Sequence, residues 1–178
     1  PSGPLLLVGL VAFCSSLGEG AMADWSAVYL RDIVLADEGT AALGYAAFSV
    51  SMVVMRLLGD RVTTLVGPVR SARLGGLIAA AGILLAILFP SVSTALTGFA
   101  MLGIGYAVIM PLAFSRAAND PNVPPGQAIS SVATLGYGGM LLGPPIIGFI
   151  AGVTDLQIGF ALLAVLAGVI IAVASSLK

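Results

Sequence analysis

The most restrictive feature of this sequence is a series of long stretches with almost no charged residue. A helix needs about 20 mainly apolar residues to cross about 30 Å of hydrocarbon. Six stretches meet this need, at residues 5–30, 41–58, 74–89, 95–114, 128–151 and 156–177. Only 8% of the 178 residues are charged and 59% are hydrophobic, whereas a soluble domain has about 25% charged residues. The chain is therefore predicted to be an all-α membrane protein with six transmembrane helices.

The composition argues against several classes of function. The chain has no histidine and a single cysteine, Cys14, so neither a Cys/His metal site nor a histidine base is available. Its only lysine is Lys178, which leaves a serine nucleophile without a base. Glu19 and Asp24 point apart on one helix and do not form a dyad that shares a proton. A net charge of -1 offers no basic field for nucleic acid. We predict no enzymatic activity, cofactor, metal or nucleic-acid partner.

The arginines and lysine indicate an orientation. With six spans both chain ends lie on one side, together with the two longest loops, 59–73 and 115–127. That side carries all the basic residues except Arg31, namely Arg56, Arg61, Arg70, Arg73, Arg116 and Lys178. Because basic residues are retained in the cytoplasm, both termini are predicted to be cytoplasmic. Trp25 and Tyr29 would then belong to an aromatic belt at the outer interface.

The same two loops divide the chain into two units of three spans each. The units, about 1–92 and 93–178, cross the membrane in opposite orientations, as in transporters built from inverted repeats. We therefore expect one six-helix domain made of two inverted three-helix repeats.

Two stretches of sequence resemble the major facilitator superfamily. The loop after the second span reads Arg56-Leu57-Leu58-Gly59-Asp60-Arg61, then Gly67-Pro68-Val69-Arg70 and Arg73. It is similar to the family signature of Gly, Asp-Arg, Gly and basic residues, which lies between spans two and three and recurs between eight and nine. The stretch from Gly139 through Gly143-Pro144-Pro145 to Gly148 is similar to a glycine-proline motif that antiporters of this family carry in span five. We infer no antiport from it.

The resemblance implies that this chain is the carboxy-terminal half of a twelve-span bacterial transporter. Its six spans would be spans seven to twelve, and Gly18 to Trp25 looks like bacterial members of uncharacterised substrate. The amino-terminal six-helix half would be missing, and the location would be the inner (plasma) membrane.

Glu19 is the most informative residue of the first span. It lies about 21 Å along that span at about 1.5 Å per residue. An ionisable group there is costly and should face the protein interior or a water-filled cavity. A desolvated carboxyl can exchange a proton near neutral pH, so Glu19 is a candidate for proton coupling or solute contact. The alternative is a protonated glutamate that hydrogen-bonds a neighbouring helix. Asp24 is a second candidate, with an ion pair at the outer interface as its alternative.

The residues of the signature loop are candidates for a conformational latch. In the family the loop aspartate meets a helix amino-terminus and nearby cations. Here the latch would comprise Arg56, Gly59, Asp60, Arg61, Arg70 and Arg116. A solvated turn is the alternative for Asp60 and Arg61. Arg56 and Arg116 are expected at the cytoplasmic ends of their spans, where they could simply anchor them.

Two tyrosines and a proline pair complete the candidates. Tyr106 and Tyr137 place hydroxyl groups deep in the bilayer, where each needs a solute or a hydrogen-bonding partner. Gly143-Pro144-Pro145 should bend the fifth span, because each proline removes a helix hydrogen bond.

The leading hypothesis is secondary active transport of a small solute by alternating access, coupled to protons if Glu19 titrates. The alternative is a six-helix channel or an assembly protein that forms a homodimer. The expected partners are the lipid bilayer, the solute, and the missing half or a second copy. No span is expected to hold a buried arginine or lysine, so an apolar or neutral solute is favoured.

Overall fold

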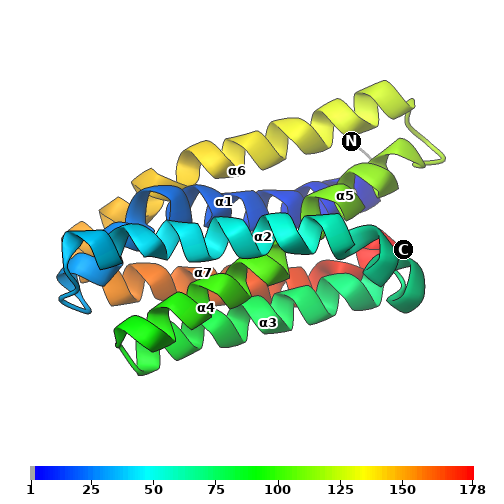
Figure 1. Cartoon of the computed structure of the whole chain (residues 1–178). Helices are drawn as coiled ribbons and strands as arrows, with labels where there is room; N and C mark the ends of the chain where they lie inside the picture. Colours follow the sequence, from blue (N-terminus) through cyan, green and yellow to red (C-terminus); the bar gives the residue numbers. More distant parts are fainter. Residues whose placement is uncertain (1–2) are drawn as a thin grey trace.

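Six apolar helical spans make up the protein in a computed structural model that describes residues 3–178 (Figure 1). The helices are α1 (Gly3–Asp32), α2 (Glu38–Val66), α3 (Pro68–Leu88), α4 (Val92–Tyr106), α5 (Ile109–Ala118), α6 (Pro125–Val153) and α7 (Leu156–Val173). A short 3₁₀ turn, Ala174–Leu177, follows α7. Together α4 and α5 form the fourth span, and each of the six spans is long and apolar enough to cross a membrane. The predicted all-α fold with six membrane-spanning helices is confirmed for this part of the chain.

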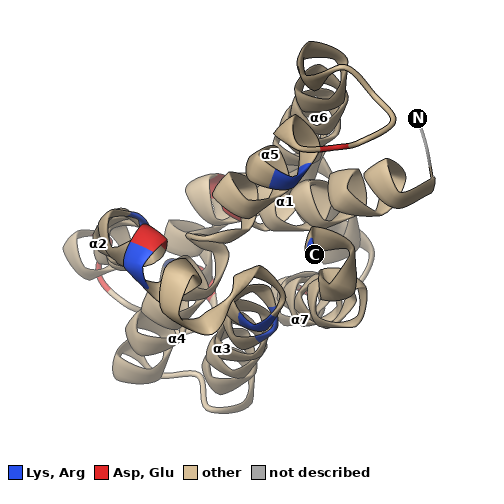
Figure 2. Ribbon diagram, turned by 90° about the vertical axis from the view of Figure 1, so that its right-hand side faces the viewer, with Lys and Arg blue, Asp and Glu red and all other residues tan. Residues whose placement is uncertain are grey.

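The helices exchange partners between the two halves of the chain. The first helix, α1, packs along most of α6, and α4 packs against α2 and α3. Seen from one end, α2 and α6 lie on either side of α1 and α5, and α4, α3 and α7 lie below them (Figure 2). Helices of the two predicted three-helix units therefore pack against one another. The exact division near residue 92 stays a prediction.

Polar caps define where several helices begin. The Asp37 carboxylate accepts hydrogen bonds from the Thr40 hydroxyl and backbone N–H, at 2.6 and 3.1 Å. These bonds to Thr40 hold the pKa of Asp37 below its usual range. Asp155 caps α7 in the same manner, with Ile158 N–H at 2.8 Å. Such caps satisfy N–H groups that the first helical turn leaves free.

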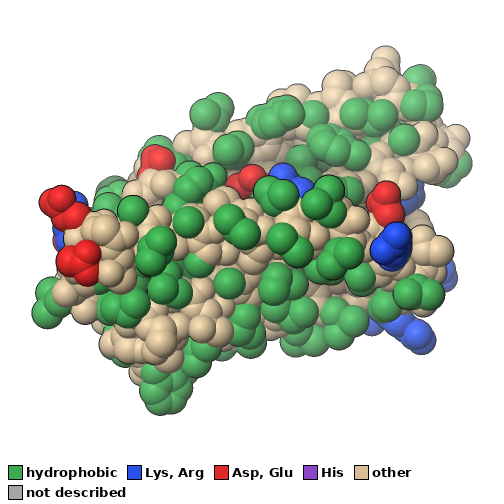
Figure 3. All heavy atoms as spheres, in the orientation of Figure 1, with side chains coloured by type: hydrophobic (Ala, Val, Ile, Leu, Met, Phe, Trp, Pro, Cys, Tyr) green, Lys and Arg blue, Asp and Glu red, His purple; other side chains and the backbone are tan. Residues whose placement is uncertain are grey.

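Charged side chains gather at the two ends of the molecule. Figure 3 shows acidic groups at the end formed by the α1–α2 connection and basic groups at the opposite end. Both chain termini lie at the basic end (Figure 1). The distribution agrees with the pattern expected from the sequence, and which end faces the cytoplasm stays a prediction.

Glycines bring the backbones of α3 and α4 into direct contact. A Cβ atom at Gly98 would collide with the carbonyl oxygen of Gly82, and one at Gly105 with the carbonyl oxygen of Gly75. The carbonyl of each α3 glycine therefore occupies the space that an α4 side chain would need. Small residues drive close helix packing in membranes, where burial of apolar surface gives no net gain.

The α1–α6 contact uses glycines in the same manner. A Cβ atom at Gly139 would meet the Phe13 carbonyl oxygen, and one at Gly143 the Leu17 carbonyl oxygen. The predicted motif Gly139-x-x-x-Gly143 is thus a packing surface against α1.

An aromatic cluster ties α1, α3, α4 and α7 together. Tyr29 is fully buried, with ring centroids 4.6 Å from Phe160 and 5.8 Å from Phe99. Its hydroxyl donates to the Ala86 carbonyl at 2.9 Å. The expectation that Tyr29 lies in an interfacial belt is wrong, because its side chain fills the space between four helices.

The predicted loop 59–73 is also wrong. Helix α2 runs to Val66, and only Gly67 separates it from α3. Gly67 has φ +88°, a conformation that side chains with a Cβ rarely adopt. The helix continues because residues 60–66 contain neither glycine nor proline, and Pro68 then starts the next helix. The second predicted loop shrinks likewise, from 115–127 to 119–124.

The fourth span, predicted as one helix, is interrupted at residues 107–108. Pro111 follows the interruption and has no N–H to offer the Ala107 carbonyl. In contrast, α6 is helical without interruption through Pro144 and Pro145. Pro144 and Pro145 have no N–H to offer the carbonyls of Met140 and Leu141, one turn earlier. Separately, the Trp25 indole N–H donates to the Pro144 carbonyl at 3.0 Å, which links α1 to this stretch of α6.

Candidate functional site

Three adjoining cavities form a groove along the face between α2 and α6. We name them after their acidic residues. The Asp60 cavity and the Glu19 cavity each have a volume of about 400 Å³, and the Asp24 cavity about 580 Å³. The first two share Arg56 and Pro111, and the last two share Tyr137 and Met140. The groove is therefore continuous, and α1, α2, α5 and α6 line it.

An ion pair occupies the middle of the groove. Arg56 Nη2 lies 3.4 Å from Glu19 Oε2, and the two side chains are 40% and 22% exposed. Figure 3 shows acidic and basic groups together near the middle of this face, far from the charges at the ends. The pair joins α1 to α2 across the groove. Because both side chains are partly exposed to the cavities, the pair is accessible to a solute.

The expectation that Arg56 lies at the end of its span is wrong. Helix α2 continues ten residues beyond Arg56, to Val66, so this arginine belongs to the interior of the span. The Arg56 side chain is 40% exposed, so the expectation that no span holds a buried arginine or lysine is not contradicted by it. The Asp60-Arg61 pair predicts the start of a loop, but both residues are helical.

Asp24 and Tyr137 line the wider part of the groove. Asp24 borders the Asp24 cavity together with Pro144 and Pro145 of α6. Tyr137 is 63% exposed and borders both this cavity and the Glu19 cavity. The remaining surface is largely apolar, with Met110, Phe114 and Met140 around the Glu19 cavity. A mainly apolar cavity with a few convergent polar groups is the usual form of a small-molecule site.

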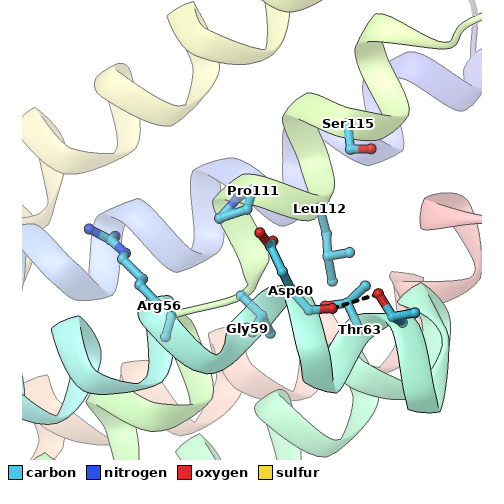
Figure 4. A pocket seen from close by; sticks show the side chains of 10 residues that line it. Arg56, Gly59, Asp60, Thr63, Pro111, Leu112 and Ser115 are labelled. Carbon is cyan, nitrogen blue, oxygen red and sulfur yellow. Dashed lines mark hydrogen bonds between the residues drawn. The ribbon is translucent and has the colours of Figure 1, made fainter.

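The Asp60 cavity lies between α2 and α5. Figure 4 shows the Asp60 side chain directed toward α5 near Pro111, whereas Arg56, one turn away, is directed away from Asp60. Gly59 is buried at the floor of this cavity. The Thr64 hydroxyl donates to the backbone carbonyl of Asp60 at 2.7 Å. The Asp60 carboxylate takes no part in this bond and faces the cavity. Within residues 3–178 the ion pairs are Arg31–Asp32, Arg56–Glu19 and Arg116–Asp120, and none involves Asp60.

The other candidate latch residues are spread over the basic end. Arg61 is exposed on α2, and Arg70 is exposed on the first turn of α3. Arg116 pairs with Asp120 at 3.1 Å, and the Asp120 side chain is 1% exposed. Asp120 also accepts the Asn122 N–H at 3.0 Å, so this pair fixes the start of the α5–α6 connection.

Tyr106 lies outside the groove. Its side chain is 1% exposed and packs against Gly18, where a Cβ atom would collide with the ring. The hydroxyl is buried and has no hydrogen-bond partner within residues 3–178. The structure therefore brings Glu19, Asp24 and Tyr137 to one surface and places Tyr106 in the core.

Sequence reasoning missed Arg56 as a partner of Glu19 and the apolar contribution of α5. The signal available for Arg56 was its position within an apolar helix that has no breaker before Gly67. Nothing in the sequence indicates that α5 contributes Met110 and Phe114 to the same cavity as Glu19, since that proximity arises from the packing of distant spans.

Six spanning helices and a groove on one face define a polytopic integral membrane protein. No protein-family model matches the chain. It is 47% identical over 178 residues to an uncharacterised transporter of Sinorhizobium fredii. It is 37% identical over 166 residues to an uncharacterised MFS-type transporter of Yersinia pestis, and 40% identical over 172 residues to membrane protein MosC of Rhizobium meliloti. The chain spans 42% to 47% of the length of these relatives and is itself covered for 93% to 100%.

Solved structures agree on the fold. A peptide transporter, POT, in complex with alafosfalin superposes with a TM-score of 0.84 at 18% identity, and the match covers 96% of this chain and 37% of the transporter. The POT family transporter PepTSo gives a TM-score of 0.80 at 16% identity, covering 98% and 37%. The chain therefore has the fold of a six-helix half of these transporters, and its relative from Yersinia pestis is named as a transporter of the major facilitator superfamily (MFS) type.

Proposed function

We propose that this chain is the carboxy-terminal half of a secondary active transporter that moves a small solute by alternating access. The observation that carries the proposal is the groove, with a charged pair midway along a face that is otherwise apolar. Ionisable residues inside membrane spans mark solute or proton pathways by default. The transporter names of two relatives and the transporter fold of the solved structures support this reading.

In this proposal Glu19 carries the coupled proton. The only group paired with the Glu19 carboxylate within residues 3–178 is Arg56, through a single contact of 3.4 Å. Protonation removes the negative charge and breaks the ionic part of this α1–α2 link, so the proton changes how two walls of the groove are held together. That change biases the two access states, because a ligand shifts an equilibrium only by binding the states unequally.

Asp60 takes the role of the latch. Its free carboxylate faces a cavity that borders α5, at the basic end where both chain termini lie. A helix amino-terminus of the other half, with its partial positive charge, would stabilise a carboxylate at this position. Breaking and remaking this contact would accompany each change of access, with Arg61 and Arg70 adding positive charge nearby. Both termini would then face the cytoplasm of a bacterial cell.

The test uses the full-length protein that contains this chain, reconstituted in liposomes loaded with the pH dye pyranine. A panel of small organic anions, cations and neutral compounds is added in turn, and solute-dependent acidification is recorded. We expect at least one compound to move protons through the parent protein. Glu19→Gln should abolish that flux, because it keeps the size of the side chain and removes its titration.

Glu38→Gln is the matched control, since Glu38 is an exposed carboxyl on the first turn of α2, outside the groove. It should retain the parental flux. Solute-driven proton flux at the parental rate in Glu19→Gln would show that Glu19 is not the carrier. Absence of transport for every compound would contradict the proposed activity itself.

A further inference from the structure

The cationic group of the groove is only partly satisfied. Arg56 makes one contact, to Glu19 at 3.4 Å, and no other hydrogen bond from its guanidinium is formed within residues 3–178. A guanidinium has five N–H donors and prefers two parallel bonds to an oxyanion. Arg56 borders two cavities of about 400 Å³ each, and its side chain is 40% exposed. Donors and space are therefore both available for a ligand.

An anion is the ligand that this group selects. The guanidinium stays protonated in proteins, and an unpaired arginine within hydrocarbon is costly. Glu19 supplies the anion in this structure, so any other anionic group has to compete with it. The titratable groups that border the groove are Glu19 and Asp24 on α1, Arg56 and Asp60 on α2, and Tyr137 on α6, with none on α5. Arg56 is the one basic side chain among them.

We propose that the transported solute carries an anionic group, such as a carboxylate, which binds Arg56 in place of Glu19. Its apolar part would contact Met110, Phe114 and Met140. This inference rests on the proposed transport function and adds the class of substrate. It replaces the expectation of an apolar or neutral solute, which depended on the absence of a buried arginine or lysine from the spans. Arg56 is partly exposed, but it borders two cavities of the groove.

Displacement of Glu19 from Arg56 by the solute would couple solute binding to proton binding. Once the solute holds Arg56, the Glu19 carboxylate has lost its counter-charge at a site where a lone charge is unfavourable. It then takes a proton from solvent onto one carboxylate oxygen, and no other bond is made or broken. Linkage requires the reverse as well, so a protonated Glu19 releases Arg56 and strengthens binding of the anion. Anion and proton therefore bind together, and the bound site gains no net charge.

The experiment compares three probes that share one body, namely phenylacetate, 2-phenylethanol and phenethylammonium. Binding to the full-length protein in detergent is measured as the concentration-dependent rise in Tm, and proton uptake is followed in weakly buffered solution. We expect phenylacetate to bind and to take up protons, and the other two probes to cause little change. Stabilisation by phenethylammonium without phenylacetate would assign the site to cations at Asp24 and overturn the proposal, as would equal effects of all three probes or none from phenylacetate.

Two variants separate displacement from a structural ion pair. Glu19→Gln removes the competitor, so it should bind phenylacetate about two- to fivefold more tightly and without proton uptake. Arg56→Gln should abolish binding, and Arg56→Lys, which keeps the charge but loses the fork, should weaken it. Arg73→Gln on α3 is the control, because Arg73 borders none of the three cavities. Weaker phenylacetate binding in Glu19→Gln would mean that the pair only holds the helices, and the proposal would be wrong.

The outcome for the substrate class is distinct from that for transport. Arg56-dependent binding of phenylacetate without any flux in the liposome assay would leave the anion site in place and remove the transport function. Proton-coupled flux of cations alone would support the transport function and contradict the anionic substrate.

Discussion

The glycine contact between α3 and α4 can be tested by adding a single methyl group. Gly98→Ala places a Cβ atom against the Gly82 carbonyl oxygen, which belongs to the backbone of α3 and cannot rotate away. The helices must therefore separate locally. Overpacking of a well-packed contact costs about 1–3 kcal/mol, and the better helix propensity of alanine offsets up to about 1 kcal/mol of this. Because the obstructing atom is backbone, the upper part of this cost applies, about 2–3 kcal/mol, and we expect a net loss of about 1–2 kcal/mol.

Gly168→Ala is the matched control. Gly168 lies in α7, where a new Cβ atom would find nothing within 4 Å, so only the gain in helix propensity applies. Thermal unfolding of the detergent-solubilised protein, followed by size-exclusion chromatography after heating, gives the Tm. At about 2–4 °C per kcal/mol for a domain of this size, Gly98→Ala should lower the Tm by about 2–8 °C. A Gly98→Ala protein as stable as the parent would refute the close contact of the two backbones.

Two further predictions concern side chains with matched counterparts. Tyr29→Phe should cost about 1 kcal/mol of stability, because it leaves the Ala86 carbonyl without its donor. Tyr106→Phe should leave stability unchanged or raise it, because the Tyr106 hydroxyl has no partner within residues 3–178. A lower Tm for Tyr106→Phe than for Tyr29→Phe would contradict this prediction. Asp60→Asn should lower the rate of solute-driven proton flux in liposomes more than the apparent affinity for solute, because the proposed latch acts on the access equilibrium without touching solute. Parental rates in this variant would leave Asp60 as a surface residue of α2.

The number of spans could be predicted because the thickness of the hydrocarbon layer imposes it. A charge-free stretch of the required length has few other places to go, and all six predicted stretches are spans. Helix ends could not be found in this way. Residues 59–66 include Asp60, Arg61 and two threonines, from which a loop is predicted, and yet they continue α2, because backbone hydrogen bonding does not stop where polar side chains begin.

The candidate site, too, could be predicted only in part from the sequence. Glu19 could be singled out from its position alone, since a lone carboxyl in a span is expensive wherever it points. Its partner could not, because Arg56 lies 37 residues away on another helix and meets Glu19 only after α1 and α2 have packed. Tyr106 shows the converse error. Its depth in the span stays a prediction, and its burial depends on packing against Gly18 of another span, which the sequence does not indicate.

A single residue, Gly67, connects α2 to α3, so the two helices cannot move far independently at this end. Its two backbone bonds, from Gly67 N–H to Thr63 and from Ser71 N–H to the Gly67 carbonyl, are both 2.9 Å and bind the joint to each helix. A tilt of α2, the helix that carries Arg56, would therefore tilt α3 as well. Since the glycine contacts fasten α3 to α4, such a tilt would also displace α4, which ends at the interruption at residues 107–108. A motion of α2 at the groove would thus be transmitted to α3 and α4, on the far side of the bundle.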